Sequence, residues 1–303
     1  MLSIIRLPGS LQRRIDAATR ALLRKENGLK IDFSRPLREE ALISPNSVSW
    51  RVFKNPIALF VGGVTAVILE LAESAVRTGV WEHSSFASDP AGRLQRTGLA
   101  AMVTVYGARS IAEPMIAQIA RRHAQVVGTT PKGVPYCASD PRLLTWVHAT
   151  AAFAFVNAYS RYVESLSDAE MDAFYREAAP AAKLYGALGA PLSCAEVSTL
   201  FDSMRGALEP SPIVFQFLKI MRGAAALPRP LFRMQPLLVR AAVELVPHWV
   251  RQCLGLDPSY GLRTHEQWFV RFAGNMTDRI VLSEAPAAQS CVRLGLPSNH
   301  LYA

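Results

Sequence analysis

Apolar side chains recur every three or four residues through most of this chain, a spacing that predicts helices rather than strands. Sustained two-residue alternation is absent, so no Asn-Gly or Asp-Gly pair joins two strand-like runs as a hairpin signal. We therefore predict an all-α fold, a single bundle of about ten helices with little or no sheet. The clearest example follows Asp140, where the apolar positions are Leu144, Val147, Ala151, Phe155 and Tyr159.

Short polar residues mark the expected helix starts. An Asn, Asp or Ser side chain accepts the free amides of a first turn, and a following proline has no amide to leave unpaired. Such pairs are Asn55-Pro56, Asp89-Pro90, Asp140-Pro141 and Ser211-Pro212. Capping boxes are expected at Ser110–Glu113, Ser167–Glu170, Ser193–Glu196 and Thr264–Gln267. Glycines at expected helix ends are Gly28, Gly79 and Gly128.

These signals divide the chain into an N-terminal helical extension, residues 1–52, and one helical domain, residues 53–303. Residues 128–139 are polar and contain Gly and Pro, so we expect a loop there. Residues 223–230 include two prolines and form a candidate hinge inside the domain.

Composition adds a thick core to this picture. Half of the 303 residues are apolar and 19% are charged, which suits a large core or a cavity for an apolar guest. The net charge of +9 comes mainly from arginines. Because these are scattered, with no basic run interleaved with aromatic residues, we expect no nucleic-acid partner.

The cysteines and the apolar runs bear on location. The four cysteines show no CxxC spacing and are expected to be reduced thiols in the cytoplasm. Charged residues interrupt the first 24 positions, so no secretory signal is predicted. The most apolar run, Ile57 to Leu69, is shorter than the ~20 residues that span a bilayer. We expect no transmembrane segment and leave peripheral membrane contact open.

Familiar enzyme motifs are missing: the chain has no GxSxG, no phosphate-binding GxxxxGK[ST] and no HExxH. Arg93, Arg96 and Thr97 instead share one helix face, at i, i+3 and i+4. They form either an anion-binding or cavity-lining group, or a solvent-facing helix edge.

Two histidines lie on apolar helix faces. His123 follows Ile116 and Ile119, and His148 lies beside Leu144 and Ala151. Each is either a hydrogen-bonded core residue or a metal ligand. A lone imidazole facing an apolar slot suits haem iron, because the porphyrin supplies the other four nitrogens. Zinc or di-iron sites need more ligands at helical spacing.

Three segments, residues 89–97, 123–128 and 140–150, resemble the rubber oxygenase/MpaB-like family, which includes latex clearing protein. The similarity is clearest from Phe53 to Pro191. It implies an all-helical fold that encloses one non-covalent haem b. By motif, His123 is the expected proximal iron ligand, and Arg93 and Thr97 are expected near the haem on its distal side.

The resemblance also assigns the neighbouring positions. Arg96 replaces a lysine that can cap the iron in latex clearing protein, and a guanidinium stays protonated and is a poor ligand. The sixth iron position is therefore expected to be open, water-bound or blocked by this arginine. His148 is expected to bind haem indirectly, by orienting a neighbour or a propionate, and is the alternative iron ligand.

One departure from the family pattern concerns Glu73. Many relatives carry Ala-His-Pro where this chain has Ala72-Glu73-Ser74. Glu73 is either a proton-handling group in the pocket or an exposed helix residue. The catalytic acid of rubber-cleaving relatives is not aligned securely, and Glu70, Glu73 and Glu82 are the candidates.

The resulting hypothesis is a haem b-dependent oxygenase. It would add dioxygen to a C=C bond of a hydrophobic substrate, either isoprenoid or an unsaturated lipid, with Arg93, Arg96 and Thr97 setting the polarity around the reacting oxygen. The alternative is a non-catalytic haem sensor, carrier or store. A third reading is a helical lipid-binding protein without metal.

Overall fold

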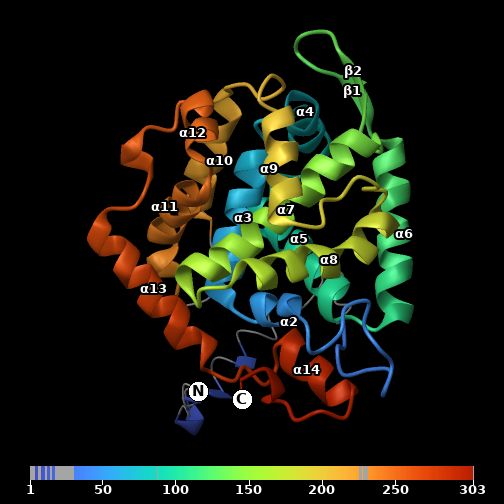
Figure 1. The fold of residues 1–303 in the computed structure, drawn as a ribbon, viewed down its shortest axis with the longest axis vertical. Helices are drawn as coiled ribbons and strands as arrows, with labels where there is room; N and C mark the ends of the chain where they lie inside the picture. The colour runs from blue at the N-terminus through green and yellow to red at the C-terminus, as the bar shows by residue number, and fades with distance from the viewer. Residues whose placement is uncertain are drawn as a thin grey trace.

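The computed structural model describes residues 4–5, 8–10, 12–13, 16–17, 31–86, 88–224, 227 and 231–302. Within these ranges the chain forms 13 α-helices and one small two-stranded sheet, which confirms the all-α prediction (Figure 1). The helices are α2 (Val48–Phe53), α3 (Pro56–Glu70), α4 (Ser74–His83), α5 (Pro90–Tyr106), α6 (Arg109–Gln125), α7 (Pro141–Tyr162), α8 (Asp168–Tyr185), α9 (Cys194–Ser203), α10 (Pro212–Gly223), α11 (Gln235–Leu245), α12 (His248–Leu254), α13 (Thr264–Asp278) and α14 (Pro286–Arg293).

The core is built around α3, which packs along α7 and is also contacted by α11 and α13 (Figure 1). Gly62 permits the close approach of α7, because a Cβ at this position would lie 2.9 Å from the Cα of Phe155. Apolar side chains from the whole bundle fill the surroundings. The largest fully buried ones include Trp50, Ile57, Ile68, Leu69, Trp146, Tyr159 and Phe217.

The predicted helix starts are confirmed wherever Asx or Ser precedes proline. Asn55 accepts hydrogen bonds from the amides of Ile57 and Ala58, both at 3.0 Å. Asp89, Asp140 and Ser211 cap α5, α7 and α10 in the same manner. These caps are local in sequence, which explains why spacing alone finds them.

Two of the four predicted capping boxes are wrong, and one is half formed. Helix α6 starts at Arg109, and Ser110 binds Glu39 instead. Arg263 rather than Thr264 occupies the cap position of α13. Ser193 caps α9, but Glu196 binds the amide of Leu192. The box at Ser167 and Glu170 is confirmed.

A short hairpin replaces part of the loop predicted at residues 128–139. Strand β1 (Val127–Thr129) pairs antiparallel with β2 (Pro135–Cys137), and Gly133 adopts a φ of 80° in the turn. Gly128 therefore lies in a strand and Gly79 inside α4, so neither ends a helix. Both make room for one ring: a Cβ would lie 3.4 Å from the Tyr136 ring at Gly79 and 2.7 Å from its hydroxyl at Gly128. The third predicted helix-ending glycine, Gly28, lies outside the described residues.

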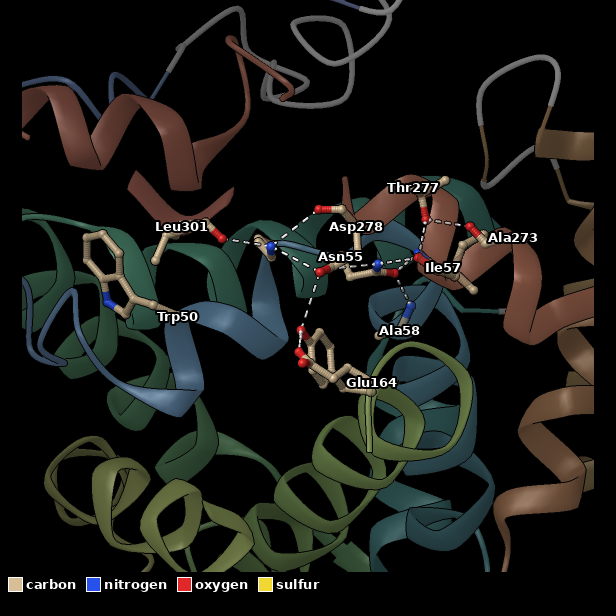
Figure 2. Close-up of polar contacts among 12 residues, drawn as sticks. Trp50, Asn55, Ile57, Ala58, Glu164, Ala273, Thr277, Asp278 and Leu301 are labelled. Carbon is tan, nitrogen blue, oxygen red and sulfur yellow. Dashed lines mark hydrogen bonds and ion pairs between the residues drawn. The ribbon is translucent and has the colours of Figure 1, made fainter. Parts of the chain in front are cut away.

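The start of α3 is joined to α13 by a buried polar network (Figure 2). The Asn55 amide nitrogen donates to the carbonyl oxygen of Gly274 at 2.9 Å and to Asp278 Oδ1 at 3.1 Å. Lys54 Nζ pairs with Asp278 Oδ2 at 3.0 Å and donates to the carbonyl oxygen of Leu301 at 2.8 Å. Asn55 thus begins one helix and holds another in place.

Contacts between the two ends of the described chain complete the bundle. The buried Arg293 of α14 donates to the carbonyl oxygens of Glu39, at 2.8 Å, and Phe33, at 2.9 Å. Most of the candidate hinge at 223–230 lies outside the described residues. The four cysteines are free thiols. Among the helices that the structure describes, none combines the length and apolar content of a membrane span.

Candidate functional site

Helix α3 is buried on every side except along one stripe. Phe60, Gly63, Val67 and Glu70 are half-buried, while the residues between them are buried. The spacing of three, four and three residues places these four on one face of the helix. This face points toward space that no neighbouring helix fills completely.

The surroundings of Gly63 are open on this face. A Cβ built at Gly63 meets no atom within 4 Å, whereas one at Gly62 would collide with Phe155. Gly98 of α5 also has no neighbour within 4 Å, because it is exposed at the surface. A central helix with an open position in its middle leaves room for a guest beside it.

Glu70 ends this stripe at the C-terminal end of α3. Burial raises the pKa of its carboxyl group to about 7, and the nearby Arg93 guanidinium opposes that rise. The side chain is half-buried, so it keeps some accessible surface at the end of α3. At neutral pH this carboxyl group is shared between its protonated and ionised forms.

Arg93 and Thr97 occupy the first turns of α5, which Asp89 and Pro90 begin. The Arg93 guanidinium donates to Thr97 Oγ1, and that hydroxyl donates to the Arg93 carbonyl oxygen at 3.0 Å. Burial lowers the pKa of Arg93, and the Glu70 carboxyl group opposes the change. The charges of Arg93 and Glu70 therefore interact, and the predicted placement of Arg93 and Thr97 on one helix face is present.

Arg96 turns toward the segment that precedes α5. Its guanidinium donates to Ser85 Oγ and lies 3.4 Å from Asp89 Oδ2. These partners hold Arg96 at the start of its own helix. The positive charge is nevertheless close enough to Arg93 to contribute to its lowered pKa.

His123 lies in the last turn of α6. Its Nδ1 atom is buried and has no hydrogen-bond partner among the described residues. Burial lowers the pKa of the imidazole, and the charge of Arg93 lowers it further. The ring is therefore neutral at pH 7, and it belongs to the same electrostatic cluster as Arg93 and Glu70. A neutral imidazole is the form that binds metal.

His148 lies in the first half of α7 on the predicted apolar stripe. Burial alone lowers the pKa of its imidazole to about 4, although the side chain keeps some accessible surface. Burial is the cause of this lowered pKa, whereas the pKa values of His123 and Glu70 also depend on the charge of Arg93.

Glu73 is not an exposed helix residue, as one of the two predictions had it, because it is a buried cap. Its side chain is 5% exposed, Oε2 accepts the amide of Val76 at 2.8 Å, and Oε1 lies 3.3 Å from Arg142 Nη2. It therefore starts α4, with Ser74 at the first helical position, where proline is also favoured. Glu82 is exposed. Of the three acidic candidates, Glu70 is the one whose raised pKa reflects burial opposed by the charge of Arg93.

The four helix ends that carry these groups lie on one side of the bundle. Helices α3 and α6 end there and α5 and α7 begin there, toward the hairpin (Figure 1). An open surface groove borders the start of α5, lined by Pro90, Gln216, Lys219, Ile220, Gly223 and Ala224. A second hollow, between residues 31–37 and Ile111, borders none of the predicted site residues.

The fold and these side chains define an all-helical protein in which the charges of Glu70, Arg93 and a half-buried His123 interact. A family profile described as "ER-bound oxygenase mpaB/B'/Rubber oxygenase, catalytic domain" matches residues 50–275. That span is more than half of the 303 residues, so the chain belongs to this oxygenase family. Comparison with curated proteins and with solved structures gives no significant match.

Members of this family depend on haem, and the residues present fit that group. An iron in porphyrin needs one protein ligand, and Nδ1 of His123 is buried without a hydrogen-bond partner among the described residues. A Cβ at Gly63 would meet no atom within 4 Å, and the apolar residues Phe60 and Val67 share its helix face. Within the described ranges no three His, Cys, Asp or Glu side chains gather as a metal site of their own.

Proposed function

We propose that this protein is a haem b-dependent oxygenase that acts on a hydrophobic, isoprenoid or unsaturated-lipid-like substrate at a C=C bond. When bound, haem b supplies the activation of dioxygen. The single observation that carries the proposal is the His123 imidazole, which is neutral at pH 7, has a buried nitrogen without a hydrogen-bond partner among the described residues, and interacts with the charge of Arg93.

In this proposal each polar side chain has a separate task. His123 holds the iron. Arg93, positioned by Thr97, supplies a positive charge and hydrogen-bond donors near the reacting oxygen atoms. Arg96 adds a second positive charge, at the start of α5. Glu70, with a pKa of about 7, can give or take a proton at neutral pH. Phe60 and Val67 bound the apolar part of the pocket and exclude water.

His148 has a supporting task. As a neutral ring on α7, it orients a neighbouring group or a haem propionate. The groove beside Pro90 offers the substrate an approach to the start of α5, one turn before Arg93.

Absorption spectra of haem titrations test the iron ligand. We expect the wild-type chain to bind one equivalent of haem with a sharp Soret band, His123→Ala to lose it, and His148→Ala to retain it. His123→Gly with added imidazole should recover the band, because the free ligand replaces the missing ring. Loss of the Soret band in His148→Ala, with the band kept in His123→Ala, would show that His148 rather than His123 is the iron ligand.

Oxygen consumption separates the enzyme from a non-catalytic haem protein. The second function is favoured by Glu73, which caps a helix where many relatives carry histidine. With unsaturated terpenoid or lipid substrates, the haem-loaded protein should consume oxygen and release carbonyl products. A normal haem spectrum without turnover on any of these substrates would favour the sensor, carrier or store.

A further inference from the structure

Helix α13 exposes three aromatic side chains on its outer face. Trp268 is 68% exposed, Phe269 45% and Phe272 50%. Trp268 and Phe272, one turn apart, stack with ring centroids 5.6 Å apart and planes at 12°. Large apolar side chains gathered on an exposed face mark an interaction surface rather than a chance exposure. We refer to Trp268, Phe269 and Phe272 as the α13 aromatic face.

The opposite face of α13 is fixed to the protein. Val270 is fully buried, and Gly274 packs directly against the end of α7 at Tyr162. Asp278 is held by Lys54 and Asn55 (Figure 2). The aromatic face is therefore presented outward by a firmly anchored helix.

The charges of α13 are divided between its two faces. Its two acidic residues turn inward, where Glu266 pairs with Arg240 at 2.7 Å and Asp278 pairs with Lys54 at 3.0 Å. The exposed polar residues beside the aromatic face are Arg263, Thr264, His265 and Arg271. The outer surface of α13 is thus aromatic and basic, in a chain of net charge +9.

The size of the face argues against a second copy of this chain as its occupant. Each aromatic ring buries about 150–250 Å², so three partly exposed rings offer roughly 300–400 Å². A stable protein interface needs about 800 Å² on each partner. A lipid surface has no such requirement, because aromatic rings enter the headgroup layer one by one and arginines attract anionic lipids.

We propose that α13 is a peripheral membrane-binding element that lies along the surface of an anionic bilayer, with Trp268, Phe269 and Phe272 inserted and Arg263 and Arg271 at the headgroups. The element packs where α3 begins and α7 ends, away from the helix ends that carry Glu70 and Arg93. Lipid binding does not depend on haem or on catalysis, so it stands apart from the proposed oxygenase function.

Co-sedimentation with vesicles tests the proposal. The full-length chain should bind phosphatidylcholine vesicles that contain phosphatidylserine, should bind phosphatidylcholine alone more weakly, and should be released by salt. The affinity of the triple variant Trp268→Ala, Phe269→Ala, Phe272→Ala for these vesicles should fall by about tenfold or more. A matched control is Leu188→Ala with Leu192→Ala, exposed apolar positions between α8 and α9, which should bind like wild type.

Two further variants separate insertion from simple charge attraction. Trp268→Phe should keep binding but lose much of the quenching of tryptophan fluorescence by brominated lipids. Arg263→Gln with Arg271→Gln should lose the preference for phosphatidylserine. Circular dichroism checks that each variant is folded. No vesicle binding by the wild-type chain, equal binding by the triple variant and the control, or a dimer that the triple variant abolishes would each overturn the proposal.

Discussion

Gly62 and Gly63 are consecutive in α3, and their α-hydrogens face opposite surroundings. A Cβ on Gly62 would lie 2.6 Å from Phe155 Cδ1, whereas a Cβ on Gly63 would meet nothing within 4 Å. We therefore expect Gly62→Ala to lower the free energy of unfolding by about 1–3 kcal/mol through overpacking. Gly63→Ala should be neutral or stabilising by up to about 1 kcal/mol, because alanine favours the helix. Urea denaturation of the two variants measures the contrast.

A bulky residue at the open glycine tests what the space is for. Gly63→Phe should leave the helical circular dichroism spectrum in place and weaken haem binding by about tenfold or more, since the ring would occupy the slot. Gly63→Ala is the matched control and should bind haem nearly as well as wild type. If Gly63→Phe bound haem as tightly as wild type, the proposed position of haem beside α3 would be wrong.

Glu70 and His148 should give the haem-free protein opposing pH dependences. The folded state keeps the Glu70 proton up to about pH 7, above its ordinary value of 4.5, so this group lowers stability as pH rises through that window. His148 titrates near 4 when folded and 6.5 when unfolded, so it lowers stability as pH falls through its window. Each contribution is on the order of 3 kcal/mol.

Replacing either Glu70 or His148 should reveal the pH dependence that the remaining group contributes. Between pH 4.5 and 6.5, the unfolding free energy of Glu70→Gln should rise with pH more steeply than that of wild type. That of His148→Gln should rise less or fall. Urea midpoints at several pH values give both slopes, and two parallel curves would contradict the assigned environments.

Glu73 should matter for stability rather than for haem. Glu73→Ala removes the cap of α4 and a partly exposed ion pair with Arg142, so we expect a loss of about 1–2 kcal/mol. Glu73→Gln keeps an acceptor for the Val76 amide and should lose less. The Soret band of both variants should lie at the wild-type position. A shifted band would show that Glu73 acts in the haem pocket.

Arg93 and Thr97 should affect turnover more than haem content. We expect Arg93→Ala to reduce substrate-dependent oxygen consumption by about 10- to 100-fold, because it removes a fixed charge and its donors. Thr97→Val should have a smaller effect, since it only frees the guanidinium. Unchanged turnover in both variants, with haem bound, would show that the assigned distal role is wrong.

The features that sequence predicted well are local ones. The caps at Asn55, Asp89 and Asp140 depend on amides two or three residues away, so spacing reveals them. Ser110 has the same local pattern but binds Glu39, which lies 71 residues earlier. The hairpin was missed because its strands have three residues each and its turn lacks the usual dipeptide.

The candidate site shows the same difference between local features, which sequence predicts, and long-range ones, which it does not. Motif spacing predicted His123, Arg93 and Thr97 as site residues, because they belong to contiguous segments that resemble a family, and these roles stay predictions. It left Glu70, Glu73 and Glu82 equivalent, since only the packing of α4 shows that Glu73 starts a helix. The chemical state of Glu70 depends on desolvation and on Arg93, 23 positions along the chain, which no local pattern contains.

The Tyr136 ring lies against two glycines from separate elements, Gly79 in α4 and Gly128 in β1. Gly128 cannot gain a side chain while the ring is present, because its Cβ would lie 2.7 Å from the Tyr136 hydroxyl, whereas a Cβ at Gly79 would touch the ring at 3.4 Å without collision. Over evolutionary time Gly128 and Tyr136 should therefore be inherited together. A descendant that loses the ring would tolerate a side chain at position 128, and an ancestor that carried one there would have held a smaller residue on the hairpin.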